Sequence, residues 1–302
     1  MADYFLYLFN QHDPEFKLNL TFLEEHSEGW LEAEDVQGKA SIYRVIQGDD
    51  NPLKSALYNQ SLEQGFDYCI LPCEQVYGPF RLAVFDMDST LIPIEVIDEL
   101  AVQAGVGEQV AAITEAAMRG ELDFNQSLEQ RVSQLKGLSV EAIQVVREQL
   151  QFNPGVEAFC RYLLEQGGKI AIASGGFMPF AEELRNRLPF SHVAANRLLQ
   201  DGDKLTGDVE HPIVNADVKA DSLKQWMTDE GLVAHNCVAV GDGANDLKML
   251  RQAGIGVAYK AKPTLGQSAD CVLNVGFLDS LIELLPIIEE RHASIIKSDN
   301  AT

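Results

Sequence analysis

The pattern of hydrophobic and polar residues changes near residue 80. From Leu82 onward, short apolar runs alternate with longer stretches in which apolar residues recur every three or four positions. The short runs have the length of buried strands and the longer stretches have the period of helices, which is typical of a parallel sheet with helices on its faces. We therefore predict an α/β core, with strands at residues 82–85, 169–173, 237–240, 255–257 and 271–273.

One interval of this core contains helical spacing without any strand-like run. It extends from about Ile94 to Leu150, between the first two expected strands. Ser139 is placed to cap its last helix, because a serine hydroxyl can accept a hydrogen bond from a first-turn amide. We predict a helical-bundle cap at about residues 94–150, inserted after the first core strand, with breaks between its helices at residues 105–107, 120 and 136–137.

The first 80 residues have a different pattern and are predicted to form a small α+β domain. The segment at residues 72–81 contains Pro72, Gly78 and Pro79, which favour a turn or an extended linker. Charge density also falls there: residues 1–80 carry 14 acidic and 4 basic side chains, whereas residues 81–302 carry 32 and 19. The expected elements are strands at 4–9, 41–46 and 68–71 and a helix at 52–64 in the first domain, and a closing helix at 278–296 in the second.

Charge and composition exclude several classes of partner. The 302-residue chain has a formal net charge of −23, so it repels nucleic acid and anionic lipid, and neither is an expected partner. No apolar run approaches the roughly 20 residues that a membrane helix requires. Residues 1–4 lack the basic start of a secretory signal, and the five cysteines show no Cys-x-x-Cys spacing, which fits a reducing compartment. We expect a cytoplasmic protein.

Two acidic clusters follow two of the expected strands directly. Asp86 and Asp88 lie where the chain leaves the first strand, and Asp242 and Asp246 follow the strand at 237–240. Ligands of open α/β sheets bind at the carboxyl ends of strands, and carboxylates suit a hard cation. An isolated Asp-x-Asp pair is more often a capped turn. The two clusters together indicate a metal site.

Two further residue groups suit an anion. Ser174 and Gly175 follow the strand at 169–173, where a hydroxyl and glycine amides at the expected start of a helix form an anion site, although a plain glycine-rich turn is the alternative. Lys219 lies at another expected helix start, where a lysine on its own is usually a solvated surface charge. A cation site beside an anion site is the arrangement that phosphoryl transfer requires.

These residues together predict a phosphatase that forms an aspartyl phosphate. Asp86 is the expected nucleophile, and Asp88 is the expected general acid and base for the leaving oxygen and the hydrolytic water. Magnesium is expected to be held by Asp86, by a backbone carbonyl near Asp88 and by Asp242, with Asp246 in support. The phosphate oxygens are expected to bind Ser174, Gly175 and Lys219.

The four motifs in this order, within about residues 82–285, resemble the haloacid dehalogenase superfamily of phosphatases, and within it the phosphoserine phosphatase family. The resemblance implies a Rossmann-like core, Mg²⁺ as cofactor and hydrolysis of the small molecule O-phospho-L-serine, the last step of L-serine biosynthesis. It also implies that Glu95 binds the substrate ammonium, that Arg131 binds its carboxylate, and that Asn245 lies near the phosphate and the seryl group. An arginine suits a carboxylate because it can donate two parallel hydrogen bonds.

Three alternatives remain at this stage. A receiver-like phosphorylation switch uses a similar set of residues but has no long helical cap. The second alternative is a phosphatase or phosphotransferase that acts on phosphohomoserine or phosphothreonine. These substrates differ from phosphoserine by one methylene or methyl group, and a binding pocket discriminates such a difference by only about 1–3 kcal/mol. Residues 1–80 show no clear signature of an amino-acid-binding ACT domain. For this segment we expect a module without catalysis that regulates the protein or forms a homodimer.

Overall fold

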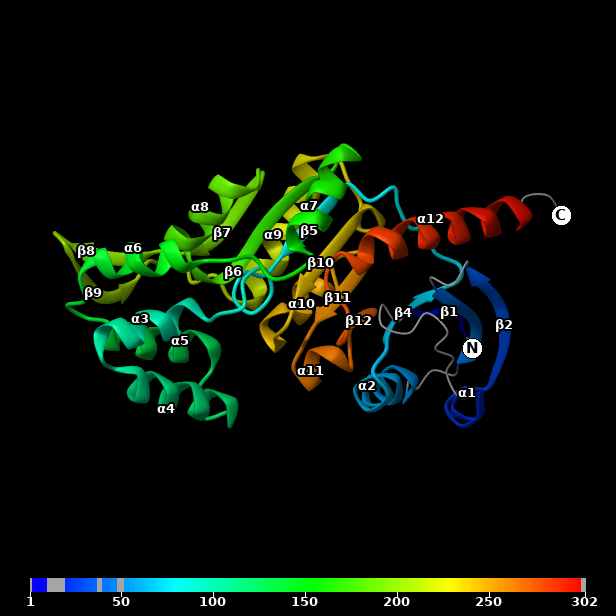
Figure 1. The fold of residues 1–302 in the computed structure, drawn as a ribbon, viewed down its shortest axis with the longest axis horizontal. Helices are drawn as coiled ribbons and strands as arrows, with labels where there is room; N and C mark the ends of the chain where they lie inside the picture. Colours follow the sequence, from blue (N-terminus) through cyan, green and yellow to red (C-terminus); the bar gives the residue numbers. More distant parts are fainter. Residues whose placement is uncertain (1, 10–19, 37–39, 48–51, 300–302) are drawn as a thin grey trace.

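The computed structural model of the chain describes residues 2–9, 20–36, 40–47 and 52–299; the parts of the expected N-terminal domain between these ranges lie outside the described residues. The main sheet has ten described strands in the order β2-β3-β1-β4-β12-β11-β10-β5-β6-β7 (Figure 1). From β12 to β7 all neighbouring strands are parallel, which confirms the predicted α/β core. These strands are β5 (Leu82–Phe85), β6 (Lys169–Phe177), β7 (His192–Asn196), β10 (Cys237–Gly241), β11 (Ile255–Tyr259) and β12 (Cys271–Leu273).

Helices cover both faces of the parallel region, so its strands are apolar throughout. In β5, Leu82 and Val84 pack on one face, and Ala83 packs with Phe85 on the other. All four side chains are buried, because successive residues of a strand point to opposite faces. The first face is covered by α9 (Ala216–Asp229), α10 (Leu247–Leu250) and α11 (Pro263–Gly266), and the second by α7 (Val156–Glu165), α8 (Met178–Arg187) and α12 (Ser280–Asp299).

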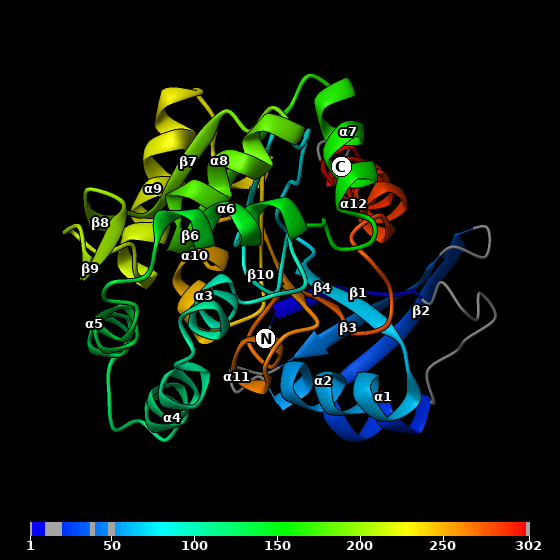
Figure 2. The ribbon, with the colours of Figure 1, turned by 60° about the vertical axis from the view of Figure 1, so that its left-hand side comes forward.

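Five helices lie in the fully described interval between β5 and β6: α7, which packs on the sheet, and four helices that precede it. These four begin and end near the glycine-containing breaks of the sequence, and Ser139 accepts a hydrogen bond from the Glu141 amide at 3.2 Å, as predicted. Asp123 and Gln126 form a reciprocal capping box at the start of the third helix. The four helices are α3 (Val96–Ala104), α4 (Gly107–Met118), α5 (Phe124–Gln134) and α6 (Val140–Gln149) (Figure 2).

A hairpin that follows β7 contacts these helices. It consists of β8 (Leu198–Asp201) and β9 (Lys204–Val209), which form a separate two-stranded sheet. The Gly137 amide donates to the Leu205 carbonyl at 2.8 Å, and the Val140 amide donates to the Asp203 carbonyl at 2.9 Å. The hairpin therefore bonds to the backbone of the connection after α5 and of the first residue of α6. The sequence pattern did not predict it.

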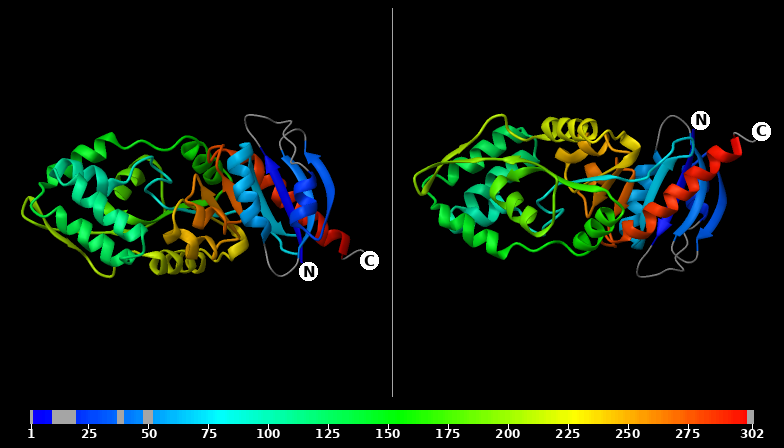
Figure 3. Two further views of the ribbon diagram at one scale, coloured as in Figure 1. Left: turned by 90° about the horizontal axis from the view of Figure 1, so that it is seen from below. Right: turned by 90° about the horizontal axis from the view of Figure 1, so that it is seen from above.

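The N-terminal strands are antiparallel and continue the core sheet. The strand β4 pairs with β12, with Cys69 opposite Cys271, so the sheet does not end at the expected domain boundary. The division at residue 80 stays a prediction. Figure 3 shows α12 crossing one face of these strands, and α1 and α2 lie on the other face. The elements are β1 (Ala2–Phe9), α1 (Leu20–His26), β2 (Gly29–Val36), β3 (Ala40–Gln47), α2 (Pro52–Gln64) and β4 (Asp67–Pro72).

Two short 3-10 helices flank β10, at Ala234–Asn236 and Ala244–Asp246. Among the described residues, no helix is both long enough and apolar enough to cross a bilayer.

Candidate active site

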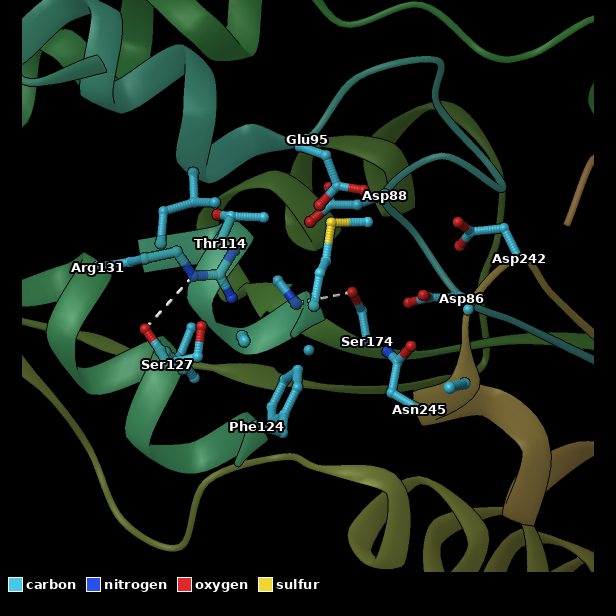
Figure 4. A pocket seen from close by; sticks show the side chains of 18 of the residues that line it. Asp86, Asp88, Glu95, Thr114, Phe124, Ser127, Arg131, Ser174, Asp242 and Asn245 are labelled. Atoms are coloured by element: carbon cyan, nitrogen blue, oxygen red, sulfur yellow. Dashed lines mark hydrogen bonds between the residues drawn. The ribbon is translucent and has the colours of Figure 1, made fainter. Parts of the chain in front are cut away.

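The polar residues that follow β5 and β10 meet Ser174, in the last part of β6, at one edge of the sheet (Figure 4). The strand β5 lies between the other two, so Asp86 leaves the sheet between Ser174 and Asp242. All three side chains line one cavity of about 520 Å³. The structure therefore brings together residues that are up to 156 positions apart in the sequence.

Lys219 and two carboxylates form a buried cluster at the base of this site. The Lys219 ammonium lies 2.8 Å from Oδ1 of Asp86 and 2.7 Å from Oδ1 of Asp246. Burial acts to lower the pKa of Lys219, but the two carboxylates more than offset it, so the pKa is raised and the side chain stays charged. Lys219 is fully buried, whereas a lone lysine at a helix start is usually solvated.

The Asp86 carboxylate is held in one orientation. Its Oδ1 accepts a hydrogen bond from the Met87 amide at 2.7 Å in addition to the contact with Lys219. Asp246 is fixed in the same way, because its Oδ2 accepts from the amides of Asp242 and Gly243 at 3.2 and 3.0 Å. A side chain at Gly241 is excluded, since its Cβ would lie 2.4 Å from the Asp246 carboxyl carbon.

Three carboxylates crowd one another in a way that suits a cation. Asp86, Asp242 and Asp246 each offer an oxygen, and these oxygens lie within 4.8 Å of one another. Burial and the charge of Asp86 raise the pKa of Asp242 to about 7 and that of Asp246 to about 6. One lysine does not balance three carboxylates, and a hard divalent cation with oxygen ligands fits the residues present. Asp88 is not part of this group.

The end of β6 differs from the expected helix start. The strand continues to Phe177 and α8 begins at Met178, so the predicted helix is present but begins a few residues later than expected, and the glycine amides lie at an irregular strand end. Ser174 is buried, and its Oγ accepts from the Gly176 amide at 2.9 Å. A Cβ at Gly176 would lie 2.6 Å from Oδ2 of Asp88. The glycine therefore allows Asp88 to approach this segment.

Asp88 has the environment of a proton donor. Its side chain is buried, and its Oδ1 has no hydrogen-bond partner in the described part of the chain. Burial raises the pKa of Asp88 well above its usual range, and the charges of Glu95 and Asp86 add to the shift. A carboxyl group with a raised pKa can carry a proton near neutral pH and donate it.

Residues from two of the inserted helices face the same cavity. Glu95 precedes α3, and its Oε1 accepts a hydrogen bond from the Ser89 hydroxyl at 2.8 Å. Arg131 lies on α5, where its Nε donates to the Ser127 carbonyl at 3.4 Å. Burial lowers the pKa of Arg131, and the charge of Glu95 opposes this shift. Figure 4 shows both side chains directed toward the cavity.

Asn245 also lines the cavity, as expected, and several lining residues were not expected. Phe124 and Thr114 belong to helical patterns that indicate ordinary core packing. Lys262 is more informative, because it follows β11 closely and its ammonium lies 3.8 Å from Oδ2 of Asp242. Its position after a parallel strand was the available signal, since Asp86 and Asp242 also follow parallel strands. The unexpected lining residues include Asp98, Thr114, Met118, Phe124, Ser127 and Lys262.

Comparisons with known proteins agree with this geometry. The family model for haloacid dehalogenase-like hydrolases matches residues 83–251. The chain is 44% identical over 222 residues to a probable phosphoserine phosphatase of Schizosaccharomyces pombe, covering 73% of this chain and 74% of that protein. It is 48% identical over 204 residues to a phosphoserine phosphatase of Haemophilus influenzae, covering 68% of this chain and 65% of that protein.

Solved structures of hydrolases and phosphatases also match this chain. A HAD family hydrolase of Salmonella enterica subsp. enterica serovar Typhi matches with a TM-score of 0.78 and 29% identity, covering 93% of this chain and 98% of that one. A phosphoserine phosphatase with a phospho-aspartyl intermediate analogue matches with a TM-score of 0.65 and 38% identity, covering 68% and 99%. The chain therefore belongs to the haloacid dehalogenase-like hydrolases, and within them to the family of the phosphoserine phosphatases.

Proposed function

We propose that the chain is a Mg²⁺-dependent phosphatase that hydrolyses O-phospho-L-serine to L-serine and phosphate, the last step of L-serine biosynthesis. One observation carries the proposal. A single cavity joins Asp86, at the end of β5, to Glu95 and Arg131, which belong to the inserted helices. A phosphate group at Asp86 therefore shares its cavity with a carboxylate and a guanidinium, the two charges that complement an amino acid.

The metal fits the acidic end of this cavity. Asp86 and Asp242 are the proposed side-chain ligands, together with the backbone carbonyl of Asp88. Asp246 is proposed to orient them, because both of its oxygens already accept hydrogen bonds from the protein. When bound, Mg²⁺ offsets the repulsion between the Asp86 carboxylate and the anionic phosphate.

The first chemical step transfers the phosphoryl group to the protein. A carboxylate oxygen of Asp86 attacks phosphorus in line, and the bond between phosphorus and the serine oxygen breaks. Asp88 gives its proton to that oxygen, so L-serine leaves as a neutral alcohol. Ser174, the Gly175 amide and Lys219 are the proposed partners of the phosphate oxygens during transfer. Lys219 remains cationic because the carboxylates of Asp246 and Asp86 outweigh the effect of its burial.

The second step releases phosphate. Asp88, now a carboxylate, removes a proton from a water molecule, whose oxygen attacks the phosphorus of the aspartyl phosphate. The bond to Asp86 breaks, phosphate leaves, and both aspartates return to their starting states. General acid and base assistance of this kind contributes roughly 10²–10⁴ in rate.

Recognition of the amino acid is assigned to the inserted helices. The terminal nitrogens of Arg131 are the proposed donors to the substrate carboxylate, where two parallel hydrogen bonds give both strength and orientation. Glu95 is the proposed partner of the ammonium group. Its carboxylate is fixed by the Ser89 hydroxyl. Asn245 and Phe124 line the cavity and are the proposed contacts for the phosphate end and the apolar part of the substrate.

A phosphate-release screen tests this proposal. Phosphoserine, phosphothreonine, phosphohomoserine and sugar phosphates are compared by kcat/KM with Mg²⁺ and with a chelator. We expect the highest value for phosphoserine, and loss of turnover with chelator that added Mg²⁺ restores. A sugar phosphate or phosphothreonine that equals phosphoserine would contradict the substrate assignment, and full activity in the chelator would contradict the metal assignment.

A further inference from the structure

The cavity is strongly acidic for a site that receives a phosphate ester. Its ionisable lining consists of five carboxyl groups, of which Asp88 is the proposed proton donor, and two cations, the Arg131 guanidinium and the Lys262 ammonium. The charge of Lys219, a proposed phosphate partner, is already balanced by Asp86 and Asp246, between which it lies. A phosphomonoester carries about −1.5 to −2 charges at pH 7. The proposed Mg²⁺ offsets part of the repulsion between this ester and the lining, and a nearby cation that is free to turn toward the phosphate would offset more of it.

Lys262 has the geometry of such a cation. Its backbone amide donates to the Asp242 carbonyl at 2.9 Å, which fixes the start of the side chain beside the proposed metal ligand. Its ammonium lies 3.8 Å from Oδ2 of Asp242, which is longer than a hydrogen bond, and the side chain is 57% exposed. All three ammonium donors therefore remain available to a phosphate oxygen, and the flexible stem of lysine allows the shift.

The N-terminal segment holds the backbone that carries Lys262. Tyr58, on α2, donates its hydroxyl to the carbonyl of Ala261 at 3.1 Å. Its ring also packs against Gly266, where a Cβ would lie 2.0 Å from the ring. Figure 2 shows α2 beside α11, the short helix that begins directly after Lys262. The segment around Lys262 is thus bonded to Asp242 on one side and to Tyr58 on the other.

We propose that Lys262 is a further phosphate-binding residue of the active site and that Tyr58 of the N-terminal segment is its positioning residue. The inference rests on the proposed function, because it assumes that a phosphate group binds at Asp86. It assigns Tyr58, on α2, a role in phosphate binding although no residue of α2 lines the cavity. The side chain of Lys262 leaves Asp242 when the phosphate arrives and contacts an oxygen of the phosphate.

The first test is Lys262→Met, measured by calorimetric binding of inorganic phosphate in the presence of Mg²⁺. We expect the Kd of phosphate to rise roughly 3- to 10-fold, the range for one partly screened charge-assisted contact. The matched control is Lys248→Met, because Lys248 is also about half exposed, at 56%, and also pairs with an aspartate, Asp217, which does not line the cavity. Lys248→Met should bind phosphate as the wild type does.

Salt dependence separates a charge effect from a change in shape. Raising the salt from about 0.05 M to about 0.5 M shortens the screening length several-fold, so the difference between wild type and Lys262→Met should shrink. Lys262→Arg should recover most of the affinity. Phosphate binding by Lys262→Met that equals wild type at low salt would overturn the proposal, and so would an effect that does not depend on salt.

The second test addresses Tyr58. Tyr58→Phe removes only the hydroxyl, and we expect a rise of about 2- to 5-fold in the Kd of phosphate, because one neutral hydrogen bond is lost. Tyr68→Phe is the control, since the Tyr68 hydroxyl donates to the carbonyl of Lys54 in the same segment at 3.2 Å. Tyr58→Phe should have no further effect in a Lys262→Met background. Full additivity of the two substitutions would show that Tyr58 does not act through Lys262.

These outcomes are distinct from failure of the proposed function. Phosphate binding is measured without turnover, so it reports on Lys262 for any phosphomonoester substrate. If the wild type hydrolyses phosphoserine and Lys262→Met binds phosphate normally, only the present inference fails. If the wild type hydrolyses no phosphomonoester, the proposed function fails.

Discussion

The N-terminal segment and the inserted helices α3–α6 are attached to the same core in opposite ways. The N-terminal segment continues the sheet, and its buried Asp67 accepts backbone hydrogen bonds from residues 274–276 at 2.7 to 2.9 Å. None of its described residues lines the cavity. The inserted helices supply Glu95 and Arg131 to the cavity, yet side-chain contacts such as the ion pair between Arg147 and Glu183 at 3.0 Å connect them to the core.

This difference assigns separate roles to the two regions. Substitutions in the inserted helices should change which ester is hydrolysed while the free energy of unfolding changes little. Substitutions in the N-terminal segment should lower the free energy of unfolding while specificity changes little, apart from the modest effect of Tyr58 on phosphate binding. The core, between the two regions, carries the chemistry itself. A substitution in the core therefore provides the reference against which substitutions in the two regions are compared.

The largest effect is expected for Asp86→Asn. Loss of the nucleophile should reduce kcat for phosphoserine by roughly 10⁴-fold or more. The fold should persist, because the substitution removes one of three crowded carboxylates. Initial rates with Mg²⁺ measure kcat, and a thermal melt shows whether the fold persists. Asp217→Asn, at an exposed aspartate away from the cavity, is the control. Retention of a tenth of the wild-type rate by Asp86→Asn would refute the assignment.

The next largest effect is expected for Asp67→Ala in the N-terminal segment. It leaves backbone amides of residues 274–276 without their carboxylate acceptor. The free energy of unfolding should fall by about 3 kcal/mol. Denaturation in urea gives this value, and kcat/KM for phosphoserine should change less than twofold. The exposed Asp201 provides a control, Asp201→Ala. If Asp67→Ala changes the preference for phosphoserine over other esters but leaves the free energy of unfolding unchanged, the N-terminal segment has a role in specificity and not in stability.

A smaller effect is expected for Arg131→Ala in the inserted helices. The variant should raise KM for phosphoserine roughly 10- to 100-fold, equivalent to about 1.5–3 kcal/mol for hydrogen bonds between charged groups. Hydrolysis of p-nitrophenyl phosphate, which has no carboxylate, should be largely preserved. Equal losses with both substrates would show that Arg131 does not read the carboxylate.

The smallest effect concerns pH and His292 on α12. His292 is buried against Phe5 and Tyr7 of the N-terminal strands, and its Nδ1 donates to the Gln75 carbonyl at 2.7 Å. Burial lowers the pKa of His292 to about 4, although the hydrogen bond opposes this shift. The folded state therefore binds the proton less readily than the unfolded state, so stability is fully present above about pH 6.5 and declines as the pH falls toward 4.

This group should account for a loss of about 1.5 kcal/mol between pH 6.5 and pH 5. Urea denaturation of the wild type and of His292→Gln at both pH values measures it. The variant should be less stable at pH 6.5, and its stability should depend less on pH. If the free energy of unfolding depends on pH identically in the two proteins, His292 is not the group responsible for the loss of stability.

The sequence predicted the centre of the molecule better than its edges. Fully buried parallel strands such as β5 are uninterrupted apolar runs, and the residues that follow them meet at one edge of the sheet, so Asp86 and Asp242 were predictable. The edge strand β2 has the sequence GWLEAEDV, in which acidic residues of low strand propensity obscure the pattern, and it was missed. The strand β7 has the sequence HVAAN, in which the first three side chains are only half-buried and no uninterrupted apolar run stands out, and it was missed as well.

Site residues that directly follow a recognisable strand could be predicted from the sequence. Site residues whose role depends on contacts with distant parts of the chain could not. The motif residues around Asp86 and Asp242 are adjacent in sequence to strands that could be recognised. Lys262 and Tyr58 are ordinary residues in their local sequence, and only the packing of α2 against α11 brings the second to the first. Ser174 was predicted, but the helix after it begins only at Met178, later than expected, because β6 continues through both glycines.

Rapid acid quench of a single turnover of ³²P-labelled phosphoserine with Mg²⁺, followed by proteolysis and mass spectrometry, tests whether Asp86 is the nucleophile. If it is, the peptide that contains Asp86 should carry an acid-stable, hydroxylamine-sensitive label that forms and disappears at rates consistent with kcat. A label on any other residue would rule out Asp86 as the nucleophile. So would turnover in which the label never appears on protein, even when the quench is faster than hydrolysis.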